Sequence, residues 1–250
     1  MGAEQPLFQH GAPAREPDSP AVFWGYQDLA VFISLAVPSL FVALLITYGA
    51  FSLLGLPPQA KAVRTLVPQF LGYGFWFLSL YLLLKLKYDR PFWPSLAWRK
   101  PDRGIVFNLL AGPALAFTVG MLGVLMKTPQ IDMPIREFLS DPVSIALMGI
   151  FATTLGPLCE ELAFRGFLQP LVQRTFGAAA GIVIAALPFA LLHGPQYGWS
   201  WRHILLLVFA AVAFGWTRHV THSTAASTVM HATYNLTFFV AFLMQRGPVG

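Results

Sequence analysis

The stretch "GPLCEELAFRGFLQP", residues 156–170, places two adjacent carboxylates and one arginine in a chain that is apolar on both sides. Between Pro142 and Gly250, Glu160 and Glu161 are the only acidic residues. A charged side chain at the centre of a membrane costs at least about 2.5 kcal/mol, so it normally faces a polar cavity or a partner. The two carboxylates therefore need an explanation if this part of the chain crosses a membrane.

The composition indicates that it does. Of the 250 residues, 56% are hydrophobic and only 11% are charged, which is outside the range of soluble domains. A helix needs about 20 apolar residues to cross a bilayer. Such runs occur at 29–54, 66–84 and 105–126, and less regular ones at 143–173, 178–192, 204–216 and 225–244. We expect an all-α polytopic membrane protein, a bundle of about seven transmembrane helices, between six and eight.

The charges predict the orientation. Residues 1–28 are Pro-rich and polar and read as a mobile tail without a cleavable signal, whereas 29–250 read as one transmembrane helical domain. The net charge of +5 reflects loop Lys and Arg residues and does not indicate nucleic-acid binding. Ten of the 16 basic residues lie on the side of the N-terminus and the 85–103 loop, against six on the other side. The short loops are typical of a bacterial inner-membrane protein, and the N-terminus is expected to be cytoplasmic.

Helical spacing separates the roles of the two carboxylates. Glu161 and Arg165 are four residues apart with the acid first, which favours an ion pair on one helix face. Glu160 lies about 100° further round the helix and has no local partner. Cys159, the single cysteine, is interpreted as a packing residue. The sequence therefore singles out Glu160 as the carboxylate that is free for chemistry.

Two further polar clusters lie in the same half of the chain. "FALLH" contains Phe189 and His193, and "HATYN" contains His231 and Asn235, each pair at a spacing of four residues. Taken singly, these residues read as interfacial or as interhelical hydrogen-bond partners. Taken with Glu160, they supply the groups that activate water and stabilise an oxyanion.

The spacing also predicts how two of these clusters meet. The midpoint between Glu160 and His193 falls at Gly177, a natural helix stop within "RTFGAAAG". An antiparallel helix pair that turns there would bring Glu160 and His193 to the same level, roughly 24 Å from the turn. This requires the fourth helix to continue past Arg165, with a kink expected at Pro170.

These motifs resemble those of the CPBP family of intramembrane proteases, which includes the CAAX prenyl endopeptidases and is also called the Abi family. "EELAFR" matches EExxxR, "FALLH" matches FxxxH and "HATYN" matches HxxxN, in the family's order. The resemblance covers about residues 142–244, the expected catalytic half.

The resemblance implies a role for each motif residue. Glu160 and His193 would activate the attacking water, and His231 and Asn235 would orient the site or stabilise the oxyanion. The supporting residues would be Glu161, Arg165 and Phe189.

The cofactor stays open at this point. We favour a metal-free scheme, with a Zn²⁺ ion held by Glu160, His193 and His231 as the alternative, since three protein ligands and a water are usual for catalytic zinc.

The expected function is hydrolysis of a peptide bond in a membrane-associated protein or peptide, at or within the lipid bilayer. A non-catalytic immunity or scaffold protein would use the same fold without turnover. A proton- or cation-coupled transporter would also explain buried Glu and His residues, but it predicts an internal repeat that the sequence lacks.

The orientation can be tested directly. We expect reporter fusions placed after Arg103 to read as cytoplasmic, because the basic residues of the 85–103 loop favour that side of the membrane. A second reporter fusion, in the 54–66 loop, should then read as extracytoplasmic. The opposite result for both fusions would reverse the predicted orientation.

Overall fold

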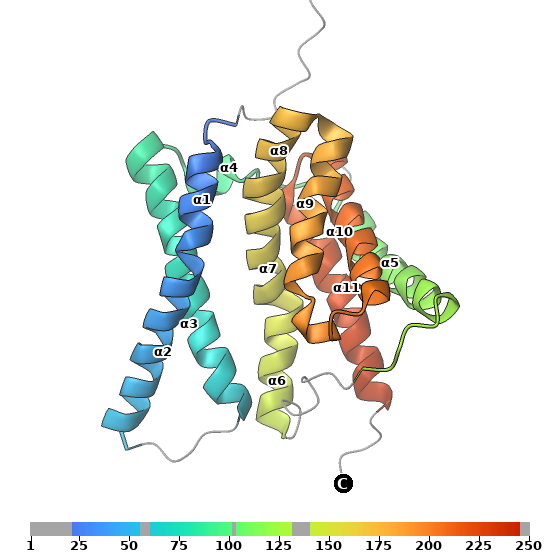
Figure 1. The fold of residues 1–250 in the computed structure, drawn as a ribbon, viewed down its shortest axis with the longest axis horizontal. Coiled ribbons are helices and arrows are strands. Elements are labelled where there is room, and N and C mark those ends of the chain that lie inside the picture. Colours follow the sequence, from blue (N-terminus) through green and yellow to red (C-terminus); the bar gives the residue numbers. More distant parts are fainter. Residues whose placement is uncertain (1–21, 56–60, 102–103, 132–140, 246–250) are drawn as a thin grey trace, which may run out of the picture.

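The computed structural model describes residues 22–55, 61–101, 104–131 and 141–245 of the chain. These residues form helices and their connections, with no strand among them, which confirms the all-α prediction (Figure 1). Five continuous helical segments are long and apolar enough to cross a membrane. They are Tyr26–Leu53, Ala62–Lys87, Ile105–Leu125, Pro142–Phe176 and Trp201–Thr221.

The other two predicted spans are also helices, although neither is among those five. Helix α9 (Ala178–Leu192) has only 15 residues, and α11 (Thr224–Gln245) has 22. Large apolar side chains cover much of the outer surface, for example Leu53 at 90% exposure and Phe117 at 72%. Such a surface suits lipid rather than water, and the chain is an integral membrane protein.

The N-terminal part is a helical hairpin that begins earlier than expected. Helices α1 (Tyr26–Ser34) and α2 (Ala36–Leu53) run on from one another and turn back into α3 (Lys61–Leu82), which ends in a π-helical segment, Leu83–Lys87. Of the predicted tail 1–28, residues 1–21 lie outside the described part of the chain. Its last residues are packed. The carboxylate of Asp28, 3% exposed, accepts hydrogen bonds from Lys87 (2.5 Å) and Tyr88 (2.6 Å).

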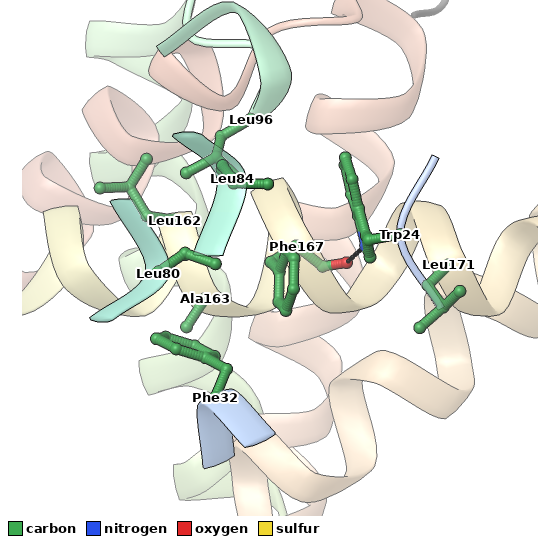
Figure 2. Close-up of a cluster of buried hydrophobic side chains, with 9 residues drawn as sticks. All are labelled: Trp24, Phe32, Leu80, Leu84, Leu96, Leu162, Ala163, Phe167 and Leu171. Atoms are coloured by element: carbon green, nitrogen blue, oxygen red, sulfur yellow. Dashed lines mark hydrogen bonds between the residues drawn. The ribbon is translucent and has the colours of Figure 1, made fainter. Parts of the chain in front are cut away.

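A buried cluster centred on Phe167 joins this hairpin to the rest of the bundle (Figure 2). The Trp24 ring stacks on Phe167 with centroids 5.1 Å apart, and its indole nitrogen donates to the Phe167 carbonyl at 3.1 Å. Phe32 contacts the same ring edge-on at 5.5 Å. Burying aromatic rings in this way contributes to stability both through the apolar area and through the ring geometry.

The fourth helical segment, Pro142–Phe176, carries the two carboxylates. Asp141 caps its start by accepting the amide hydrogen of Ser144 at 3.0 Å. The segment comprises α6 (Pro142–Ile150), α7 (Gly156–Glu161) and α8 (Gln169–Phe176), separated by π-helical turns at Phe151–Leu155 and Leu162–Leu168. The predicted continuation past Arg165 is confirmed.

Both π-helical turns of the fourth segment are followed directly by a helix with a proline in its first turn. These prolines are Pro157 in α7 and Pro170 in α8. Proline lacks an amide hydrogen, and its ring clashes with the carbonyl four residues earlier in a regular α-helix. A π turn shifts the hydrogen bonds to a spacing of five residues, which relieves that conflict. The helix therefore absorbs both prolines and remains one segment.

The predicted turn at Gly177 is confirmed, because its φ of 82° lies in the left-handed region that favours glycine. Helix α9 then runs antiparallel to α8 (Figure 1). With 15 residues against the 35 of the fourth segment, α9 ends beside that segment's middle. A loop, 193–200, follows, in which every amide hydrogen donates to a carbonyl of the loop or of the last turn of α9. Helix α10 (Trp201–Thr221) continues the chain.

Helix α5 (Ile105–Leu125) packs closely on α11. At Gly112, an added Cβ would lie 2.0 Å from the Thr233 hydroxyl oxygen and 2.4 Å from the Met230 carbonyl oxygen. The backbones of α5 and α11 can approach this closely only with a glycine at that position, as is common between membrane helices.

We therefore expect Gly112→Ala to lower the thermal stability of the purified protein, because overpacking of this kind typically costs about 1–3 kcal/mol. Gly120, on the same helix, has open space around its Cα. Gly120→Ala is the matched control and should leave the melting temperature unchanged or raise it slightly. Equal melting temperatures for the two variants would contradict the close packing.

Candidate active site

Three helical segments carry the motif residues, namely the fourth segment, α9 and α11. Glu160 and Glu161 end α7, and His231 faces them from α11. His193 caps the end of α9, and Asn235 lies one turn after His231. The expected catalytic half, residues 142–244, therefore supplies all of the motif residues.

Glu161 holds the centre of this arrangement. Its side chain is fully buried, and its Oε1 lies 3.0 Å from Nη1 of Arg165, which confirms the predicted ion pair. The same oxygen accepts a hydrogen bond from Nδ1 of His231 at 2.9 Å. Because a carboxylate can only accept here, Nδ1 carries the proton and Nε2 of a neutral His231 carries the lone pair.

Arg165 connects this pair to the neighbouring helices. Its side chain is 1% exposed, and Nη2 donates to the Ala211 carbonyl of α10 at 2.8 Å. The guanidinium also lies 4.6 Å from the centre of the Phe189 ring, a favourable cation–π distance. The Phe189 ring in turn contacts His193 and His231, with centroids 4.8 and 5.8 Å away. Phe189 is thus packed between the arginine and both imidazoles.

Glu160 differs from its neighbour in exposure and in partners. Its side chain is 24% exposed, whereas that of Glu161 is 0%. Its Oε2 lies 3.8 Å from Nε2 of His231, a distance too long for a direct hydrogen bond. The two atoms are close enough for one small polar molecule to contact both. Glu160 is therefore the carboxylate with room for a ligand.

His193 is oriented by its own helix. Its Nδ1 lies 2.8 Å from the Phe189 carbonyl, which can only accept, so Nδ1 carries the proton and Nε2 the lone pair. Within the described residues, Glu160 and His193 form no ion pair or hydrogen bond with each other. The imidazole within ion-pair distance of Glu160 is that of His231. The proposed partnership of Glu160 with His193 stays a prediction.

Asn235 binds the fourth helical segment. Its side-chain nitrogen donates to the Ala152 carbonyl at 2.8 Å, within the first π-helical turn. An amide nitrogen carries two hydrogens, so one remains for a second acceptor. The residue therefore fixes α11 against the π turn and keeps donor capacity.

Among the described residues, no group of three His, Cys, Asp or Glu side chains lies close enough together to hold a metal ion. Nδ1 of His231 is engaged by Glu161 and Nδ1 of His193 by a backbone carbonyl, which leaves Nε2 of each ring with its lone pair, as in histidines that bind a metal. The zinc alternative stays a prediction.

The structure adds a residue that the motifs do not contain. Tyr73 of α3 lies within electrostatic reach of Glu160. It belongs to the N-terminal half, where the sequence offers no motif and no polar cluster. Only the packing of α3 against the fourth helical segment reveals it.

Tyr73 also lines a groove whose wall includes Cys159, the residue before Glu160. The groove has a volume of about 730 Å³ and lies between α3 and the fourth helical segment. Its walls are mainly apolar and aromatic, with Phe77 and Tyr81 on one side and Leu155 and Cys159 on the other. Lys85 and Arg90 line its far end. Tyr73 and Lys85 are separated by 12 residues, which corresponds to about 18 Å of helix.

Comparison with protein families gives one match. Residues 142–237 match the family described as "Type II CAAX prenyl endopeptidase Rce1-like". No curated protein and no solved structure matches the chain. The matched range contains the three motifs and ends two residues after Asn235.

The buried charges make a testable contribution to stability. Arg165→Ala leaves the Glu161 carboxylate buried without its cation, and Glu161→Gln leaves the Arg165 guanidinium buried without its anion. Breaking a buried pair in this way typically costs about 3–5 kcal/mol. We expect both variants to lower the melting temperature in detergent. Glu160→Gln is the matched control, because the partly exposed Glu160 forms no ion pair with Arg165, and it should melt like the wild type. Unchanged melting of Arg165→Ala would show that the ion pair is not structural.

Proposed function

We propose that this membrane protein is an intramembrane endopeptidase, because its residues 142–237 match the Rce1-like type II CAAX prenyl endopeptidase family. The observation that supports this most directly is the spacing of 3.8 Å between the Glu160 carboxylate and Nε2 of His231. A water molecule can lie within hydrogen-bond distance of both atoms. Hydrolysis needs a base placed in this way.

In the proposed reaction, Glu160 takes a proton from the water as its oxygen attacks the peptide carbonyl. The carbonyl carbon becomes tetrahedral and its oxygen becomes an oxyanion. The proton then passes to the leaving amine, and the carbon–nitrogen bond breaks. Glu160 suits this role because it is the accessible carboxylate of the two, free of the ion pair that engages Glu161.

His231 acts with Glu160 in this scheme. Its Nδ1–H is held by Glu161, so Nε2 points its lone pair toward Glu160 and the water. If Nε2 gains a proton during the reaction, the Glu161 carboxylate stabilises the imidazolium, as the aspartate does in a serine protease triad. The second amide hydrogen of Asn235 can donate to the oxyanion, whereas Nε2 of His193 carries a lone pair and can accept a hydrogen bond from the water or the amine.

The groove lined by Tyr73 favours a substrate with an apolar segment. It leads from Cys159, adjacent to Glu160, along α3 to Lys85 and Arg90. A peptide with an apolar or lipid-modified segment would bury that segment against the aromatic wall, at about 25 cal/mol per Å² of apolar area removed from water. We propose a membrane-associated protein or peptide as the substrate, cut near the level of Glu160.

The test is cleavage by purified protein in liposomes. A quenched fluorescent peptide would carry a farnesylated cysteine fourth from its C-terminus, and the same peptide without the lipid would measure the need for it. Glu160→Gln keeps the shape but removes the base, so we expect the rate to fall by about 10²–10⁴-fold with an unchanged fold. His231→Ala should fall by at least about 10²-fold.

Arg64→Gln is the matched control, because it replaces an exposed charged side chain that lines neither the groove nor the site, and it should cleave like the wild type. Wild-type turnover by a folded Glu160→Gln variant would reject the assignment of the base. A folded wild type that binds the peptide without cutting it would instead favour a scaffold or immunity role.

Metal dependence follows a separate prediction. With Glu160 and His231 acting directly on water, protein treated with a strong chelator and desalted should keep its full cleavage rate. Loss of activity that returns with one equivalent of Zn²⁺ would replace the metal-free scheme and make Glu160, His193 and His231 the candidate ligands. Metal analysis of the untreated protein would provide the occupancy.

A further inference from the structure

A second pocket lies at the end of the bundle that carries the α8–α9 turn and the start of α1 (Figure 1). Its volume is about 350 Å³. Its lining includes the Trp24 side chain and four basic side chains, those of Arg174, Arg218, His219 and His222. We call it the basic pocket. It is separate from the Glu160 site, since Arg174 follows Glu160 by 14 residues, or about 21 Å of helix.

The arginines of the basic pocket have only neutral partners within the described residues. Nε of Arg218 donates to the Thr224 hydroxyl at 3.1 Å, and Nη1 of Arg174 donates to the Val22 carbonyl at 2.8 Å. Arg99 lies close enough to Arg218 for the two positive charges to repel each other. No carboxylate in the described part of the chain is paired with any of the three.

Such an arrangement is unfavourable without a counterion. Arg218 is partly buried, so its charge is less well solvated than on an open surface. A second cation nearby adds repulsion, and the only acidic residues after Pro142 are at the distant Glu160 site. An anion bound in the pocket would satisfy the unused N–H groups of both arginines and remove the repulsion.

The hydrogen bonds available in the pocket match a phosphate group. The Gln173 amide nitrogen lies 3.5 Å from Nδ1 of His219, and a proton on Nε2 of that imidazole would make it a further donor. Together with the planar guanidinium groups, the pocket offers several N–H donors. Arginine is well suited to phosphate because its N–H groups can bind two oxygens at once.

The position of the pocket favours a lipid as the source of the phosphate. It opens at the same end as the 85–103 loop, whose Trp93, Trp98 and Arg99 have the character of an interfacial anchor. The charge distribution predicts that this end is cytoplasmic, where anionic lipids attract basic segments. We propose that the basic pocket binds the phosphate of an anionic phospholipid headgroup, with Trp24 against the adjoining apolar part.

The experiment measures thermal unfolding of the full chain in detergent with added lipid. Phosphatidylglycerol should raise the melting temperature of the wild type more than phosphatidylcholine does. Arg174→Gln and Arg218→Gln should each weaken the phosphatidylglycerol effect, shifting the half-maximal lipid concentration about tenfold to a hundredfold, as expected for losing a charged hydrogen bond. Arg64→Gln, which removes an exposed arginine from the opposite end of α3, is the matched control and should respond like the wild type.

Inorganic phosphate and glycerol phosphate form the second arm of the experiment. A stronger response to phosphatidylglycerol than to either soluble phosphate supports the lipid. A response to soluble phosphate alone, lost in Arg174→Gln, keeps the phosphate site but overturns the lipid as its source. Equal effects of the two lipids without any phosphate effect overturn the site. If Arg218→Gln does not fold, Arg174→Gln decides, because Arg174 is exposed and its replacement leaves the packing intact.

Discussion

The arrangement of the bundle around its polar centre depends on one buried ion pair, Glu161 with Arg165. Neither charge could be placed there alone, because each isolated ion would cost several kcal/mol to bury. The pair also reaches beyond its own helix. Arg165 donates to Ala211 of α10, and Glu161 accepts from His231 of α11. Three helices are thus held in register by a single set of charges, and the position of Glu160 follows from that register.

The two adjacent carboxylates show how strongly the environment differentiates identical side chains. The helix turns Glu161 into the core, where its charge is balanced, and leaves Glu160 partly exposed with an imidazole nearby. Glu161 therefore has the structural role, and its neighbour Glu160 is left for the proposed reactive role. A single carboxylate could not both hold Arg165 and Nδ1 of His231 and remain available to accept a proton from a ligand.

Much of this could be predicted from the sequence, because the relevant signals are local. The ion pair follows from a spacing of four residues, and the turn follows from Gly177. The contact between Glu161 and His231 could not be predicted in this way. It joins residues 70 positions apart and depends on how α11 rotates against α7. Tyr73 was missed for the same reason, since only the packing of α3 brings it near Glu160. The π-helical turns were missed too, although Pro157 and Pro170 mark where each one ends.

The loop after α9 has a consequence for how the centre of the bundle is sealed. Irregular backbone is normally excluded from the interior of a bilayer because its amide groups would lack partners. In the 193–200 loop every amide hydrogen is already bonded within the loop or to the end of α9. The loop can therefore lie at the depth of His193 without recruiting solvent for its donors. Apolar surroundings can therefore approach this loop without leaving any of its amide hydrogens unpaired.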